Sequence, residues 1–261
     1  MRIAIGLEYC GTAFTGWQSQ RDGRGVQDAL ERALAAIAAR PVGTIAAGRT
    51  DTGVHATMQV AHFDAEVARP DTAWVRGVNS HLPESVGVLW ALPVAGSFHA
   101  RNAASARRYT YLLVNRPVRP ALLAGRVGWY HQPLDVAAMA ESAAHLVGTH
   151  DFSAFRAAEC QAKSPSKTLT DAAIVADGDH VRFDFCANAF LHHMIRNIVG
   201  SLVYVGAGKH PPSWIADLLE GRDRARAAPT FAPDGLYFVG ADYQPKWGLP
   251  PTRRAVAIPK A

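Results

Sequence analysis

The chain has 261 residues, enough for one large hydrophobic core or two small ones. It is 49% hydrophobic and 19% charged with a net charge of +5, a balance typical of a globular protein and not of a disordered one. No apolar run reaches the length of a membrane span and the N-terminus has no signal-peptide pattern, so we expect a cytoplasmic protein. Three widely separated cysteines indicate neither a disulfide framework nor a zinc knuckle.

The first part of the chain predicts a strand, a helix and further strands. Apolar residues alternate from Arg2 to Tyr9, as in a half-buried strand. Val26, Leu30 and Leu34 recur at helical spacing, which predicts an amphipathic helix over 25–39 that ends before a proline. Strands are expected over 56–64 and 86–91.

A second block with similar content begins near Phe98. Alternation predicts a strand over 108–114, and Asp135 is placed to cap a helix that ends at Gly148. Further on, the pattern predicts strands over 170–176 and 180–186 around a hairpin turn, helices over 189–205 and 212–220, and a strand over 236–243. The sequence therefore predicts an α+β protein with mixed or antiparallel sheets and a cleft where the halves meet.

The short segment from Gly48 to Ala56 carries the most informative carboxylate. Asp51 lies between two glycines and two residues from Arg49, and a carboxylate beside a fixed positive charge is expected to stay ionised. This makes Asp51 a candidate nucleophile. An ordinary turn residue that caps its own backbone is the alternative interpretation.

Basic residues gather in one stretch of the second block. Between Arg101 and Arg126 there are six arginines and no acidic residue. Guanidinium groups suit phosphate oxygens, so the stretch favours a nucleic-acid partner, although a solvated basic surface gives the same pattern. No metal site is expected from the histidines, because adjacent His192 and His193 would point to different sides of a helix and no third ligand has a familiar spacing.

Five segments in a fixed order resemble the tRNA pseudouridine synthase A family. The first is Gly48-Arg49-Thr50-Asp51-Thr52-Gly53-Val54-His55-Ala56, in which Thr52 and Gly48 replace the common alanine and serine. The other four are Phe98-His99-Ala100-Arg101, Arg107-Arg108-Tyr109-Thr110-Tyr111, His150-Asp151-Phe152 and Asn188-Ala189-Phe190-Leu191-His192-His193-Met194-Ile195-Arg196-Asn197-Ile198-Val199-Gly200. Together they extend the resemblance from about residue 2 to about residue 243.

The resemblance implies a fold and an assembly. It implies two related α/β subdomains whose sheets join into one, with a central active-site cleft and a homodimer that binds tRNA across both subunits. The expected divisions are an N-terminal subdomain over 1–97 that carries the catalytic aspartate, a C-terminal subdomain over 98–245 and a loose tail over 246–261.

The resemblance also implies an activity and a set of site residues. The expected reaction converts uridine to pseudouridine at positions 38, 39 and 40 of the tRNA anticodon stem-loop, after the target base is flipped out, without metal or other cofactor. Asp51 is the expected catalytic residue, and the expected substrate-binding residues are Tyr109, Arg49, Arg196 and Leu236. The candidate contacts to the RNA backbone are Arg24, Arg101, Arg107 and Arg108.

Ordinary roles stay open for two of these residues, and two other functions compete. Tyr109 could be a core aromatic and Leu236 a plain strand leucine. Asp51-Thr52-Gly53 is also the tripeptide of aspartic proteases, but the chain has no second copy, and Arg49 would disfavour a proton shared between two carboxylates. A non-catalytic RNA-binding module would explain the arginines and leave the Asp51 turn without a purpose.

Overall fold

The computed structural model describes residues 1–257 and divides the chain into two compact units. Unit 1 comprises 1–107 and 237–257, and unit 2 comprises 108–236. The chain leaves unit 1 within strand β5 (Ala104–Asn115) and returns within strand β10 (Leu236–Tyr243). The subdomain bounds predicted from the sequence stay a prediction, because compact packing units and folding domains need not coincide.

Unit 1 is built on an antiparallel core of strands. β1 (Arg2–Tyr9) pairs with both β3 (His55–Asp64) and β4 (Val86–Val94), and the short β2 (Ile45–Ala46) pairs antiparallel with β3. The Tyr237 end of β10 runs parallel to the start of β3. Strands predicted at 2–9, 56–64 and 86–91 are therefore confirmed to within a few residues.

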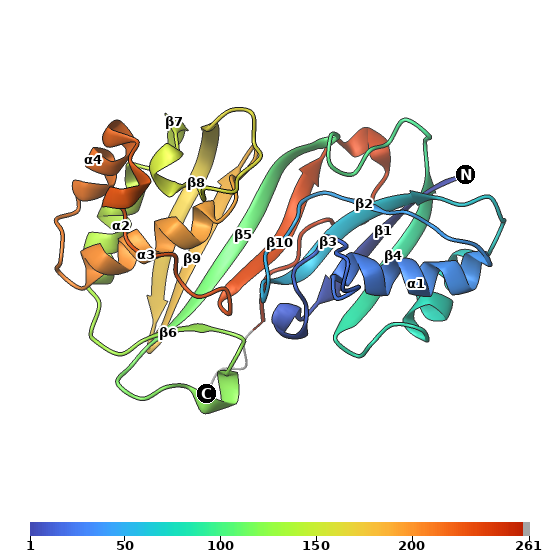
Figure 1. Cartoon of the computed structure of the whole chain (residues 1–261), viewed down its shortest axis with the longest axis horizontal. Helices are drawn as coiled ribbons and strands as arrows, with labels where there is room; N and C mark the ends of the chain where they lie inside the picture. Colours follow the sequence, from blue (N-terminus) through green and yellow to red (C-terminus); the bar gives the residue numbers. More distant parts are fainter. Residues whose placement is uncertain (258–261) are drawn as a thin grey trace. The chain divides into compact units, whose positions relative to one another are not determined.

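One helix covers these strands. Figure 1 shows α1 (Val26–Ala38) running across β1, β3 and β4, with Leu30 and Leu34 fully buried. On the edge near β4, Trp74 of the short helix η2 (Ala73–Gly77) packs edge-on against Phe63 at 5.2 Å between ring centroids. This apolar interior supports the loop after β1 and the turn between β2 and β3.

Unit 2 places a second set of strands beside three helices. The strand order is β5-β9-β8-β7, from β9 (His180–Ala187), β8 (Ser166–Asp177) and β7 (Gly148–Asp151), while β6 (Gly128–Tyr130) pairs in parallel with β5. In Figure 1, α2 (Val136–Ala144), α3 (Met194–Gly206) and α4 (Trp214–Gly221) gather together over this set. Asp135 caps α2 by accepting a hydrogen bond from Ala138 N at 2.9 Å, as predicted. The α+β class with mixed and antiparallel pairing is confirmed.

Some predictions differ from the structure, and one of them is the end of α2, which lies at Ala144 and not at Gly148. The helix expected over 189–205 begins only at Met194, because His193 adopts a left-handed backbone (φ 60°) that the α-helix cannot continue through. The part of the tail around Arg254 is held on unit 1, where its backbone N–H donates to Val239 O at 2.9 Å, whereas a loose segment was predicted. Residues 258–261 of that tail lie outside the described residues. None of the helices within 1–257 has the length and hydropathy of a membrane span.

Candidate functional site

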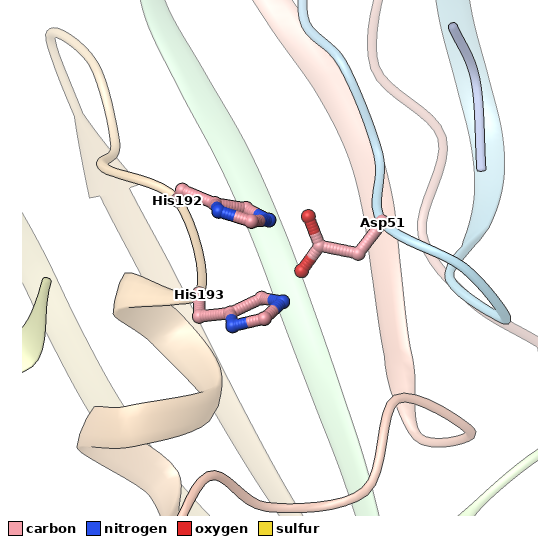
Figure 2. Close-up of side chains that lie close together, drawn as sticks. All are labelled: Asp51, His192 and His193. Carbon is pink, nitrogen blue, oxygen red and sulfur yellow. The ribbon is translucent and has the colours of Figure 1, made fainter. Parts of the chain in front are cut away.

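Asp51 lies on the turn between β2 and β3 and is half-buried. Figure 2 shows its carboxylate projecting away from the chain trace. The turn closes when Val54 N–H donates to Asp51 O at 3.1 Å, and Gly53 supplies the positive φ of 80° that the turn requires. The glycine-bounded segment predicted as a turn is confirmed as one.

Three contacts fix the backbone immediately before Asp51. Tyr9 OH and Thr50 Oγ1 are hydrogen-bonded at 2.8 Å, and Gln59 Nε2 donates to Gly48 O at 2.7 Å. Trp17 N–H donates to Thr50 O at 2.9 Å. Because Tyr9, Thr50 and Gln59 are buried, water does not compete strongly for these bonds, and the turn has little freedom to shift.

The loop after β1 approaches the Asp51 turn so closely that only glycine fits. At Gly16 (φ 98°) a Cβ would lie 2.6 Å from Thr50 O, and at Gly11 it would lie 2.0 Å from Val54 O. Gly11 N–H also donates to His55 Nδ1 at 3.0 Å. The backbone at Gly16 therefore packs against the start of the turn and the backbone at Gly11 against its end. A larger residue at either glycine would push the turn away.

Sequence reasoning missed the residues that hold this turn. Gln59 carried one weak signal, since it is a polar residue between the apolar residues Met58 and Val60, and in the structure it is fully buried. Tyr9 and Gly16 carried none, because their contacts with Thr50 join segments more than 30 residues apart. They are positioning residues for the Asp51 turn.

The predicted arginines of unit 1 have different surroundings. Arg24, Arg49 and Arg101 are exposed, and Arg49 and Arg101 lie on the same surface hollow. Arg107 instead donates from its guanidinium to the carbonyls of Ala47, at 3.2 and 3.3 Å, and Ala104, at 3.0 Å. These bonds give Arg107 a structural role, and its contact with phosphate stays a prediction.

Tyr109 and Tyr111 lie on the same strand of unit 2 with different environments. Tyr109 is 8% exposed, and its ring meets that of Phe190 edge-on at 5.2 Å. Tyr111 is fully buried, and its hydroxyl donates to Ala232 O at 2.8 Å. Burial raises the pKa of Tyr111 well above its usual value, and the charge of Asp234 raises it further. Tyr111 is thus a neutral core residue.

Arg196 lies on the first turn of α3 and is held by the segment that leads to β10. Its Nε donates to Phe231 O at 2.9 Å, and its own carbonyl accepts from Phe231 N–H at 3.2 Å. One turn along, Gly200 allows the backbone of Pro229 to pass, since a Cβ there would lie 2.4 Å from Pro229 O. Leu236 is 5% exposed at the first position of β10.

The two histidines before α3 lie differently from the sequence-based expectation. Figure 2 shows His192 and His193 projecting from the segment that precedes the helix, and their ring centroids are 4.0 Å apart. The expectation that the two rings point to different sides of a helix is wrong, because His193 is the residue before the helix and has a left-handed backbone. That the histidines bind no metal therefore stays a prediction, and the spacing of His192 and His193 no longer supports it.

Comparison with known proteins relates the whole chain to one enzyme family. The family model described as tRNA pseudouridine synthase matches residues 6–101 and 142–244. A protein of Dechloromonas aromatica named tRNA pseudouridine synthase A is 64% identical over 250 residues, covering 96% of this chain and 95% of the relative. Relatives of the same name from Methylobacillus flagellatus and Aromatoleum aromaticum are 60% and 59% identical, covering 99% and 100% of this chain and 99% and 98% of their own lengths. The chain belongs to the tRNA pseudouridine synthase family, whose members are isomerases.

Proposed function

We propose that this enzyme converts uridine to pseudouridine at positions 38, 39 and 40 of the tRNA anticodon stem-loop, acting in the cytoplasm as a homodimer. The observation that carries the proposal is the match of nearly the whole chain to relatives named tRNA pseudouridine synthase A, with Asp51 on a turn braced by buried contacts. The target positions and the dimer rest on the family resemblance.

The reaction rearranges bonds within one nucleoside. The bond from N1 of uracil to C1′ of the ribose breaks, the base turns, and C5 forms the new bond to C1′. The C5 proton leaves and N1 takes up a proton, so atoms and electrons balance without a redox partner. The proposal therefore includes no cofactor, and requires a positioned carboxylate, a place for the turned base and a group that receives the C5 proton.

Asp51 is the proposed catalytic residue. Its carboxylate either bonds to C1′ as uracil departs, or removes a ribose proton to start the same departure. In both cases the distance to the sugar must be controlled closely, and the contacts of Tyr9, Gln59 and Gly16 with the turn support that control.

The remaining residues are proposed to bind and orient the target. Stacked bases are inaccessible inside RNA, so the uridine must be flipped out, and Arg49 is proposed to fill the space left behind or to hold the displaced nucleotide. Tyr109 is proposed to pack on the uracil and relay its proton, Leu236 to exclude water, and Arg196 to pair with the Asp51 carboxylate. Arg196 has a fixed backbone and a bonded Nε within unit 2, which supports a positioned guanidinium.

Unmodified tRNA transcripts test this proposal directly. Pseudouridine is mapped by chemical labelling, because isomerisation leaves the mass unchanged, and transcripts with cytidine at 38, 39 or 40 identify the target positions. We expect labelling at each of the three positions where uridine is present and none where it has been replaced. Labelling elsewhere in the tRNA would overturn the positions, and no labelling at all would overturn the activity.

A further inference from the structure

Unit 1 contains a hollow that shares only Arg49 with the residues to which the proposed reaction gives a role. Its volume is about 340 Å³, at the lower end of the range for sites that hold a small ligand. We call it the Arg101 pocket; the residues that matter here are Gln18, Ile45, Arg49, His99, Arg101 and Asn102. Asp51 is not among the described residues that line it, although Arg49 is only two residues away in the chain.

The charge of the pocket is positive. Arg49 and Arg101 both line it, and no described lining residue is acidic. Partial burial lowers the pKa of the Arg101 guanidinium, and the positive charge of Arg49 lowers it further. Guanidinium groups stay protonated even so, and two of them side by side are stabilised by an anion such as phosphate, whose oxygens match the guanidinium fork.

The walls of the pocket are fixed before any ligand arrives. Arg107 bonds to the carbonyls of Ala47, just after β2, and of Ala104, and so ties β2 to the segment that carries Arg101. Among the other lining residues, Gln27 of α1 accepts from Gln18 Nε2 at 2.9 Å and donates to Thr44 O at 3.2 Å. A preorganised pocket loses less conformational entropy when a ligand binds, which increases its affinity for a ligand of matching shape.

The pocket also offers groups that suit more than a phosphate. Ile45 is 39% exposed and lines the pocket, and its apolar side chain is a surface on which a base or ribose can pack. The side-chain amides of Gln18 and Asn102 can both donate and accept hydrogen bonds, as the edges of bases require. Positive charge, apolar surface and amides together match the three parts of a nucleotide.

We infer that the Arg101 pocket holds one nucleotide of the RNA next to the uridine that is isomerised, with its phosphate between Arg49 and Arg101 and its base or ribose against Ile45. The inference rests on the proposed function for the identity of the RNA. The nucleotide differs from the target, because Asp51, the proposed catalytic residue, does not line the pocket. The pocket then determines the register of the strand on the Asp51 turn.

Arg101→Gln tests the phosphate contact, and Arg40→Gln is its matched control. Arg40 lies in the same unit and pairs with Glu66 at the surface, so its loss removes the same charge outside the pocket. We expect Arg101→Gln to raise Kd and KM for tRNA about tenfold, with a smaller change in kcat, and to reduce the salt dependence of binding by about one counterion. Arg40→Gln is expected to change neither. Equal behaviour of the two variants would overturn the inference.

A binding measurement on the wild-type enzyme keeps this test separate from the proposed activity. The arginine Nε–Hε signals are followed by NMR while adenosine monophosphate is added, and the Arg101 signal is identified by its absence in Arg101→Gln. A saturable shift of that signal supports the pocket even if no pseudouridine is made. No shift, in an enzyme that does isomerise tRNA, would overturn the pocket and leave the proposed function standing.

Discussion

Replacing Gly16 by alanine tests whether the position of the Asp51 turn limits catalysis. The added Cβ would lie 2.6 Å from Thr50 O, and ordinary contact begins at 3.4 Å, so one of the two backbones must move by about 0.8 Å. A displacement of about 1 Å at a reacting group can cost about 100-fold in rate. We therefore expect the variant to fold and to lose roughly that factor in kcat/KM.

Gly23→Ala is the matched control for backbone strain. Gly23 also has a positive φ, of 65°, but the nearest heavy atom to an added Cβ is Arg32 Nη1 at 3.8 Å. Both variants are expected to lose about 1 to 2 kcal/mol of unfolding free energy from the left-handed conformation alone. Single-turnover isomerisation of a tRNA transcript, measured beside chemical denaturation, separates the effects. Equal activity of the two folded variants would refute the reasoning.

The remaining predictions concern a tyrosine pair and a buried histidine. Tyr109→Phe should fold normally and isomerise tRNA more slowly. Tyr111→Phe should keep its activity and lose about 1 kcal/mol of unfolding free energy, because its hydrogen bond to Ala232 O is removed. The opposite pattern in kinetic and denaturation assays of the two variants would contradict these roles. Burial, aided by the charge of Arg2, lowers the pKa of His62 to about 4 from the ordinary 6.5. The unfolded chain then binds more protons between these values, so unfolding free energy should fall as the pH drops from 6.5 towards 4, and His62→Gln should flatten that slope.

Local patterns predicted most elements because their causes are local. The spacing of Leu30 and Leu34 reflects the buried face of α1, and both α1 and β1 are observed within a residue or two of their predicted bounds. The prediction that β1 is half-buried is wrong, because residues on both of its faces, such as Ile3 and Ala4, are buried. The start of α3 could not be predicted in this way. The helical spacing of apolar residues continues upstream of Met194. The helix nevertheless begins at Met194, because the backbone of His193 is left-handed.

The candidate site could be predicted as a set of residues but not as an arrangement. Asp51 was identified from its turn and from the family motif, and the structure confirms the turn. The contacts that hold it join segments distant in sequence, such as Tyr9 with Thr50, and no local pattern encodes them. The role of Arg107 could not be predicted either, because a run of basic residues does not reveal that one guanidinium donates to backbone carbonyls.

The identity of the catalytic group is tested most directly by Asp51→Asn. The substitution keeps the size of the side chain and removes its negative charge, and Asp71→Asn makes the same change at an exposed position. With unmodified tRNA, we predict that Asp51→Asn binds within a few-fold of wild type and forms no detectable pseudouridine, while Asp71→Asn behaves as wild type. Pseudouridine formed by Asp51→Asn at the wild-type rate would contradict the account.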